Sequence, residues 1–174
     1  MTWINDKEWA RIQQLMPIVC VDILPIVCSP SGGINRIGLI KRHTPHQGDK
    51  WCTVGGRLLF GESLQDGIIR QLRDTLGLGI QIVGSLDIQP LYVAQYSPSL
   101  ESAAGFDAVD PRKHAVALTY LLEIEGETAP QNEALDFQWY TISEFRMNEH
   151  IGFGQGKVIE ICLERFEGLN KGCY

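Results

Sequence analysis

The sequence has no Cys-x-x-Cys pair, no uninterrupted apolar run of membrane-spanning length and no excess of positive charge. Its five cysteines are an odd number in a chain of 174 residues. A disulfide framework or a zinc site built from cysteine pairs is therefore not expected. We expect reduced, mostly buried thiols. The cysteines are Cys20, Cys28, Cys52, Cys162 and Cys173.

The longest apolar run extends from Met16 to Cys28 and is interrupted by Pro17, Asp22 and Pro25. It is too short and too broken to cross a bilayer. The segment before it carries acidic residues such as Asp6 where a secretion signal would need an apolar core. We therefore expect no membrane partner and a reducing, cytoplasmic location.

The formal net charge of the chain is −6, which argues against binding to the phosphate backbone of nucleic acids. The apolar fraction of 44% and the charged fraction of 21% are typical of a globular protein. A chain of this length can bury a full core as one domain. We expect a single domain over residues 1–174, whose partner is a small molecule.

Residues 1–16 contain an expected N-terminal helix from Asp6 to Met16. Asn5 and Glu8 have the spacing of a capping box, and Pro17 ends the pattern. The apolar stripe of this helix could pack on the domain or against a second copy of the chain. From this stripe, we expect a homodimer.

The clearest helix extends from Ser63 to Leu76, because apolar residues recur along one face of it. Ser63 can cap its start, and Gly77 or Gly79 can end it. Gly67 in its interior indicates close packing against a neighbour. The apolar stripe consists of Leu64, Ile68, Leu72 and Leu76. A last helix is expected at residues 154–167, with Lys157 to Phe166 as its core.

Segments rich in Val and Ile predict the strands, and the first two are expected to form a hairpin. Ser143 is expected to cap a brief helical turn, and the long loop from Ser97 to Arg112 is of a kind that is often functional. The order of elements favours an α/β (α+β) sandwich with helices on both faces of a mixed central sheet. The predicted strands are Ile18–Cys28, Arg36–Lys41, Trp51–Val54, Ile80–Ile88, Leu91–Tyr96, Ala115–Ile124 and Phe137–Thr141.

The chemistry is concentrated in residues 55–78. Gly55 and Gly56 allow a ligand to approach the backbone closely. On the helix that follows, Gln71, Asp74 and Thr75 share one face, away from the apolar stripe. Such oxygen-bearing side chains could hold a hard cation such as Mg²⁺. From spacing alone, a solvated polar helix face is the more ordinary explanation.

This stretch resembles the Nudix box, which has the pattern Gly, five residues, Glu, seven residues, then Arg-Glu-apolar-any-Glu-Glu-any-Gly-apolar. Here Gly56 is followed after five residues by Glu62, and after seven more by Arg70. Gly77 and Leu78 complete the pattern. The resemblance implies a Nudix-type α/β/α sandwich and hydrolysis of a nucleoside diphosphate linked to another moiety. It also implies that Arg70 pairs with Glu62.

The chain departs from the box at its metal ligands. Of the three acidic positions in the second half of the box, only Asp74 keeps a carboxylate, whereas Gln71 and Thr75 stand at the other two. Fewer negative ligands should weaken Mg²⁺ binding. The resemblance implies a site for Mg²⁺ or Mn²⁺ made of the Gly56 carbonyl, Asp74, Glu133 and Gln71, and completed by substrate phosphates.

Sequence features outside the box resemble the GDP-mannose mannosyl hydrolases, a Nudix branch with a reduced ligand set. Lys41-Arg42, Trp51 and Gly55-Gly56-Arg57 recur at the same spacing, and Glu133 falls in the late acidic loop. A nucleotide sugar is therefore one candidate substrate. Ala134 stands where that branch has its histidine base, and Thr75 where it keeps a Glu, so its mechanism does not transfer whole.

The remaining site residues are assigned by chemistry. Arg42 and Arg57 would clamp the diphosphate, since a guanidinium matches phosphate oxygens. His114, then His46, are candidates for the general base, and Glu133 could also serve as base if it is not a metal ligand. Aromatic residues that could stack on a nucleobase are Trp51, Tyr92, Tyr96 and Trp139, although such strand residues are usually core.

Two functions therefore stay open. The first is a Mg²⁺-dependent Nudix-type hydrolase in which Glu62, Asp74, His114 and Glu133 serve catalysis, and His46 lies near the substrate. The second is a catalytically impaired Nudix-fold module that binds a nucleotide-like ligand, which the residues Gln71 and Thr75 motivate. The bond that would break, P–O or C–O, is not readable from the sequence.

Overall fold

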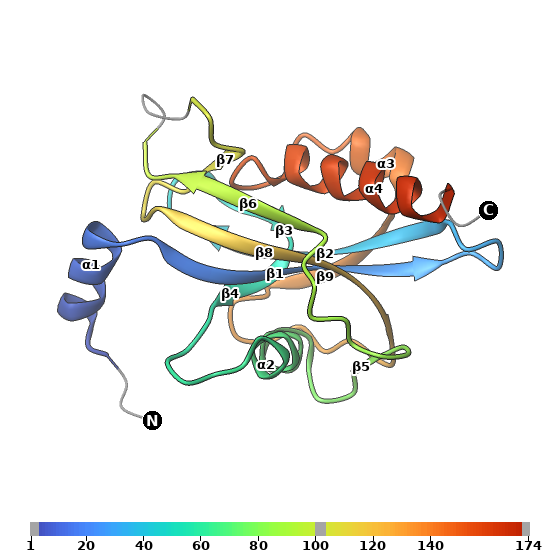
Figure 1. The fold of residues 1–174 in the computed structure, drawn as a ribbon, viewed down its shortest axis with the longest axis horizontal. Helices are drawn as coiled ribbons and strands as arrows, with labels where there is room; N and C mark the ends of the chain where they lie inside the picture. Colours follow the sequence, from blue (N-terminus) through green and yellow to red (C-terminus); the bar gives the residue numbers. More distant parts are fainter. Residues whose placement is uncertain (1–3, 100–103, 172–174) are drawn as a thin grey trace.

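The computed structural model describes residues 4–99 and 104–171. In this part of the chain, nine strands form a mixed sheet with helices on both faces (Figure 1). The predicted α/β/α sandwich is therefore confirmed. In chain order the elements are α1 (Asp6–Leu15), β1 (Ile18–Cys28), β2 (Ile34–Thr44), β3 (Gly48–Cys52), β4 (Val54–Arg57), α2 (Leu64–Leu76), β5 (Gln81–Ile82), β6 (Tyr92–Ser97), β7 (Ala108–Val109), β8 (Ala115–Glu125), β9 (Asp136–Thr141), α3 (Ile142–Arg146) and α4 (Gln155–Lys171).

Strand β1 is the centre of the sheet. It pairs antiparallel with β2, as the predicted hairpin requires, and parallel with β8 along most of its length. Its first half also pairs antiparallel with β4, which brings Gly55 opposite Asp22 and Gly56 opposite Val21. The two glycines are thus fixed on the middle of the sheet.

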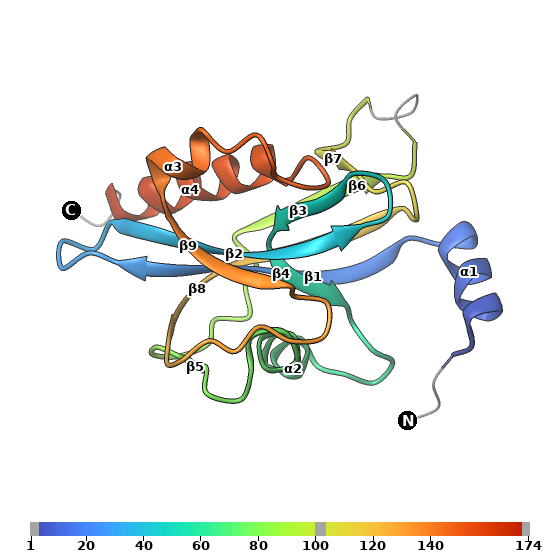
Figure 2. The same ribbon diagram turned by 180° about the vertical axis from the view of Figure 1, so that it is seen from behind.

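The helices lie on opposite faces of the sheet, and the view from behind shows the same layers (Figure 2). Helix α2 covers one face and buries Ile68, Leu72 and Leu76 in the larger core cluster. Helix α4 covers the other face and buries Ile159 and Leu163 against Leu24. Helix α1 projects at the end of the sheet where β1 begins.

Local sequence signals account for most helix ends. In α1, the Asn5 side chain accepts a hydrogen bond from the Glu8 N–H, as the capping box predicts. Ser63 caps α2 by accepting from the Asp66 N–H, and Gly77 ends it with φ 95°. A side chain at Gly67 would collide with Leu58, so the predicted close packing is confirmed.

The predicted strand Trp51–Val54 is divided between two strands, because the chain changes partners at Thr53. Residues before it belong to β3 on β2, and residues after it belong to β4 on β1. Gln155, at the start of α4, replaces the missing strand partner. Its amide oxygen accepts from the Thr53 N–H at 3.0 Å, and its amide nitrogen donates to Thr53 Oγ1 at 2.9 Å.

Two further boundaries differ from the prediction. The strand expected at Ile80–Ile88 is limited to β5, because Gly84 takes φ 77° and the chain leaves the sheet edge. The short helix α3 is capped by Thr141 and not by Ser143, because Thr141 and Glu144 complete a capping box.

The cysteines of the described segments are free thiols. Cys20, Cys52 and Cys162 are buried, as expected, and Cys28 is half-buried. Burial raises the pKa of Cys20 to about 11 and that of Cys52 and of Cys162 to about 12, so all three stay protonated near neutral pH. Cys173 lies outside the described residues. None of the helices described is both long and apolar enough to cross a bilayer.

Candidate functional site

The glycine pair lets polar groups from two elements reach the backbone of β4. A Cβ atom at Gly55 would lie 2.6 Å from Asp22 Oδ1, and one at Gly56 would lie 2.7 Å from Gln71 Nε2. Any side chain would therefore push away a buried carboxylate or the amide of the box helix. This close approach explains why glycine is needed at both positions.

The box helix presents its polar residues in two different environments. Gln71 is 8% exposed and Thr75 is 2% exposed, so both are buried, while the Asp74 side chain is 58% exposed. The interpretation of this face as a solvated surface is therefore wrong for Gln71 and Thr75. Gln71 Nε2 lies 3.5 Å from the Arg57 carbonyl oxygen, which holds the amide beside β4.

The loop before β9 is bound to the end of the box helix. The Gln131 N–H donates to the Thr75 carbonyl at 3.0 Å, and the Asn132 side chain donates to the Asp74 carbonyl. Asn132 itself takes φ 55°, a turn conformation that asparagine tolerates. These contacts hold the loop that carries Glu133 against the end of α2 that carries Asp74.

Together these elements surround an open cavity of about 470 Å³. It brings together four residues that the sequence assigns to a metal: Gly56, Gln71, Asp74 and Glu133. Gly55, Thr75 and Asn132 complete the lining. The cavity therefore combines two carboxylates with amide, hydroxyl and carbonyl oxygens.

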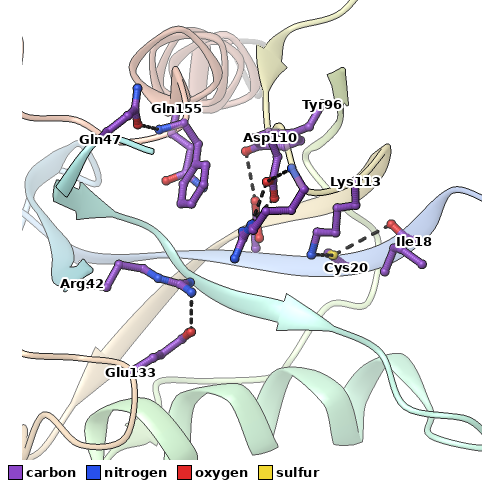
Figure 3. A network of polar contacts seen from close by, with 12 residues as sticks. Ile18, Cys20, Arg42, Gln47, Tyr96, Asp110, Lys113, Glu133 and Gln155 are labelled. Atoms are coloured by element: carbon purple, nitrogen blue, oxygen red, sulfur yellow. Dashed lines mark hydrogen bonds and ion pairs between the residues drawn. The ribbon is translucent and has the colours of Figure 1, made fainter. Parts of the chain in front are cut away.

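Arg42 and Glu133 form an ion pair at the edge of this cavity (Figure 3). Arg42 Nη2 lies 2.6 Å from Glu133 Oε2, and the Arg42 side chain is 17% exposed. Arg42 Nε is buried and has no hydrogen-bond partner within the described residues. The residue assigned to phosphate and the residue assigned to a metal thus neutralise each other.

Glu62 and Arg70 form a second ion pair with a different role. Arg70 Nε donates to Glu62 Oε1 at 2.6 Å, and Arg70 Nη2 donates to Glu62 Oε2 at 2.9 Å. Glu62 also accepts from the Leu59 N–H, and Arg70 also donates to the Arg57 carbonyl. The Arg70 hydrogen bonds hold the pKa of Glu62 below its usual value. The expected pairing is confirmed. It connects the box loop, which joins β4 to α2, with the box helix α2.

A second cavity of about 60 Å³ shares Gly55 and Gly56 with its neighbour and is also lined by Arg42. Asp22 lies within it, and Tyr96 donates a hydrogen bond to Asp22 Oδ2 at 3.1 Å. Burial raises the pKa of Asp22 to about 6, although the Tyr96 hydroxyl and the charges of Lys113 and Arg42 oppose that rise.

The loop before β8 contributes charged groups to this second cavity. Arg112 binds Asp110 through two hydrogen bonds of 2.8 and 2.7 Å, and Lys113 Nζ lies 3.7 Å from Cys20 Sγ. No sequence motif assigns a role to these residues. Two sequence features could have indicated the charged residues of this cavity. Asp22 is a charged residue inside an apolar strand, and Asp110 and Arg112 lie at the end of the long loop.

Three predicted residues lie elsewhere. Arg57 does not line either cavity, and its guanidinium stacks 3.8 Å above the centre of the Trp9 ring. His46 is exposed on the turn between β2 and β3. His114 contacts the edge of Phe106, and its Nε2 is buried without a partner in the described chain.

The aromatic residues proposed for base stacking mostly pack against, or hydrogen-bond to, other side chains of the chain. Tyr96 is buried with its hydroxyl on Asp22, and Trp51 packs edge-on against Tyr140 at 5.4 Å. Trp139 packs against Phe137, while Tyr92 donates to Asp107. The interpretation as core aromatics is therefore supported at these positions.

The donors around the cavity of about 470 Å³ decide whether a divalent ion fits there. Over the residues that the structure describes, no group of three His, Cys, Asp or Glu side chains comes together. Mg²⁺, however, is usually held by one or two carboxylates, with waters and substrate phosphates as the remaining ligands. Asp74 and Glu133 meet that smaller requirement, with the oxygens of Gly56 and Gln71 beside them. The residues present thus fit a metal that binds together with a phosphate-bearing substrate.

Comparison with known proteins identifies relatives over most of the chain. The family model described as Domain of unknown function (DUF4916) matches residues 1–165. No curated protein matches the sequence. A solved structure from Jonesia denitrificans, described as a possible asymmetric diadenosine tetraphosphate hydrolase, is 30% identical. That match has a TM-score of 0.76 and covers 88% of this chain and 96% of the other.

More distant structures share the fold. The MutT NUDIX hydrolase of Burkholderia pseudomallei is 19% identical with a TM-score of 0.62, over 86% of this chain and 98% of its own. A bifunctional NMN adenylyltransferase/ADP ribose pyrophosphatase of Francisella tularensis, complexed with AMP and a Mn ion, is 20% identical with a TM-score of 0.65. That match covers 92% of this chain, which spans only 45% of the Francisella protein.

Proposed function

The chain belongs to the Nudix superfamily and to the family described as Domain of unknown function (DUF4916), and from that premise we propose a Nudix-type hydrolase that cleaves a nucleoside diphosphate linked to another moiety. One observation carries the proposal: the cavity of about 470 Å³ joins Gly56, Gln71, Asp74 and Glu133. These residues come from β4, α2 and the loop before β9, so only the fold brings them together.

We propose that this cavity holds one Mg²⁺ or Mn²⁺ through Asp74 and Glu133, with Gly56 and Gln71 as neutral oxygen ligands. When bound, such an ion neutralises the phosphates and lowers the pKa of a bound water. The residues of the chain supply the orientation. Asp74 lines the cavity, with its side chain 58% exposed and Oδ2 3.8 Å from Arg70 Nη1. Glu133 must separate from Arg42 to bind the ion.

Arg42 would then bind a diphosphate oxygen. A guanidinium donates hydrogen bonds to phosphate oxygens as it does to carboxylate oxygens, and the Glu133 carboxylate now occupies this position. Arg57 is a weaker candidate for the clamp, because its guanidinium faces Trp9. A substrate that separates Arg42 from Glu133 gives each group a new partner of opposite charge.

Glu133 lines the cavity and is the proton acceptor of this proposal only if it is not a ligand of the ion. Ala115 and Ala117 line the second cavity, and side chains alternate between the two faces of a strand. His114 therefore points to the opposite face, where it contacts Phe106. His46 is exposed and lines neither cavity. Both histidines remain candidates only if the loops that carry them move on substrate binding.

The substrate class is tested by turnover of a panel with Mg²⁺, with Mn²⁺ and with EDTA. The panel contains GDP-mannose, ADP-ribose and diadenosine tetraphosphate, the last because of the activity named for the 30% identical relative. Product masses after reaction in ¹⁸O-labelled water show whether a P–O or a C–O bond breaks. The Asp74→Ala variant should lose metal-dependent turnover. Undiminished turnover in that variant would refute the proposed site.

The alternative is a Nudix-fold module that binds a nucleotide-like ligand without cleaving it. It is favoured by two observations: Gln71 and Thr75 replace box carboxylates, and Arg42 neutralises Glu133. A panel member that raises the melting temperature but is recovered intact after long incubation with metal would support this alternative. Cleavage of that compound would exclude it.

We also propose a homodimer, because α1 exposes apolar residues at its end. Leu15 is 70% exposed and Met16 is 56% exposed. Light scattering behind size-exclusion chromatography gives the mass in solution. A species of twice 19.5 kDa supports the dimer, and a species of 19.5 kDa across the concentration range refutes it.

A further inference from the structure

A third cavity, of about 700 Å³, lies at the far end of β8 from the charged groups and is larger than either polar cavity. It is bounded by β8, by the loop between β5 and β6, and by the last turns of α4. Its walls are mainly apolar and include Ile82, Leu91, Leu121, Phe166 and Leu169. None of the residues assigned to hydrolysis lines it.

The hydrogen-bond pattern of β8 shows which backbone groups face this cavity. The Ile18 N–H donates to the His114 carbonyl, so even-numbered residues of this segment bond to β1. Odd-numbered residues face the other edge, where the Thr119 carbonyl accepts from the Leu91 N–H. The Glu123 carbonyl accepts from the Val83 N–H at the same edge.

Leu121 lies midway between those two contacts. Its N–H and C=O point toward the same open edge, where the pairings of β8 with β5 and with β6 both stop short of Leu121. The chain between Val83 and Leu91 does not supply one, because it leaves the sheet edge at Gly84. Unpaired backbone groups beside an apolar surface are costly, and they usually have a partner in the working state of a protein.

We propose that this cavity binds a neutral, planar heterocycle of nucleobase type, whose adjacent acceptor and donor pair with the N–H and C=O of Leu121. A peptide strand does not fit, because the edge positions at Thr119 and Glu123 are already occupied and only one residue is free. A volume of about 700 Å³ lies within the usual range for small-molecule sites.

The surrounding side chains favour a neutral ligand. Arg165 contributes one positive charge but is held over the Tyr92 ring at 4.6 Å and donates to the Leu91 carbonyl. Asp87 and Glu123 contribute negative charges that are also engaged, with the N–H groups of Gln89 and Cys28. A flat, uncharged base leaves these pairs intact and buries its faces against the apolar walls.

Gly168 offers a way to fill the cavity without disturbing the fold. It lines the cavity, and a Cβ atom added there has no neighbour within 4 Å. Gly168→Leu should therefore occupy the site while α4 stays intact. Glu164→Leu places the same side chain on the same helix at an exposed position that does not line the cavity, and is the matched control.

The test is a backbone amide NMR titration with adenine, which carries an acceptor beside a donor, and with unsubstituted purine, which lacks the exocyclic donor. Adenine should shift the amides of Leu121 and Val83 in the wild type and in Glu164→Leu. Its affinity should fall at least tenfold in Gly168→Leu, and purine should bind more weakly than adenine.

Three results would overturn the proposal: no shift at Leu121 with millimolar adenine, unchanged binding in Gly168→Leu, or a change in oligomeric state in that variant, which would make the cavity an interface between copies. The site does not depend on the proposed hydrolysis. Turnover should be unchanged in Gly168→Leu, so failure of one proposal leaves the other standing.

Discussion

Two ion pairs flank the glycine pair of the candidate site, and they differ in how firmly each is held. Glu62 and Arg70 share two direct hydrogen bonds, and each also binds the backbone of the box loop. Arg42 and Glu133 share one short contact, and Arg42 keeps an unsatisfied buried nitrogen. The first pair joins two parts of the fold. The second joins two groups that a ligand would separate.

This difference shows that two close, opposite charges do not by themselves reveal whether an ion pair stabilises the fold or binds a ligand. A pair that also binds backbone groups fixes a loop, and its loss should appear as reduced stability. A pair whose members line two different cavities supplies groups that can bind a ligand. Loss of such a pair should appear as reduced ligand affinity and turnover. Each of the following experiments separates these two kinds of effect.

The largest effect is expected for Glu133→Gln. This change removes one of the two carboxylates from the proposed metal site and should lower turnover by about 10²–10³-fold. The free energy of unfolding should change by less than about 1 kcal/mol, because the pair with Arg42 is partly exposed. Steady-state kinetics and urea unfolding of the same preparation measure both. A large loss of stability with normal turnover would reverse the assignment of the two pairs.

Asp22→Asn measures the free-energy cost of burying a charged carboxylate. Asp22 has a hydrogen bond but no ion pair within the described residues. Its pKa is 3.8 when solvated and about 6 in the fold, so the folded state favours the protonated acid. The cost of burying the charge is absent below pH 3.8 and complete above about pH 6. The difference between the two pKa values corresponds to a free energy of about 3 kcal/mol.

Asp22→Asn should therefore stabilise the protein by up to this amount at pH 8, and the gain should shrink toward zero near pH 4. Urea unfolding at several pH values measures the change. A gain of equal size at pH 8 and pH 4, or a loss at pH 8, is incompatible with a raised pKa for Asp22.

Glu62→Gln breaks the pair that we consider structural. It should lower the free energy of unfolding by about 1.5–3 kcal/mol, because charged hydrogen bonds to Arg70 are lost in a site where the Glu62 side chain is only 7% exposed. The pKa of Glu62 is lowered by folding, so its contribution is present above the unfolded pKa and disappears as the pH falls through the folded one.

Urea unfolding at pH 7 and at low pH tests this, with the exposed Glu127→Gln as the matched control. The control should unfold like the wild type. If Glu62→Gln is no less stable than the control, the pair does not hold the box loop.

The smallest effect is expected for Trp9→Leu, which removes the aromatic face from Arg57 and keeps an apolar side chain. The lost cation–π contact should cost about 0.5–1 kcal/mol. Trp9→Phe retains a ring face and should lose less. Equal diphosphate affinity in all three proteins supports a structural role for Arg57. A clear change in affinity would restore Arg57 to the phosphate clamp.

Local patterns predicted the box helix well. Ser63 and Gly77 mark the ends of α2, and the apolar stripe sets its buried face. The strand predicted at Ile80–Ile88 is much shorter in the structure. Its apolar residues alternate as in a strand, but Gly84 turns the chain away from the sheet edge. A single glycine with positive φ is not visible in hydrophobic periodicity.

The candidate site could be predicted only where its residues lie close in sequence or follow a known spacing. The box spacing indicated Gly56, Asp74 and, through the resemblance, Glu133. The contact between Tyr96 and Asp22 joins residues 74 positions apart, and only the folded sheet brings them together. The pairing of Arg42 with Glu133 likewise depends on the docking of the loop onto α2.

The most direct test of the central claim is Mn²⁺ binding followed by electron paramagnetic resonance, with and without a diphosphate analogue whose bridging oxygen is replaced by CH₂. The account predicts one Mn²⁺ per chain, bound more tightly when the analogue is present, and loss of this site in Asp74→Ala. No bound Mn²⁺ in the wild type with the analogue, or the same binding in Asp74→Ala, would contradict it.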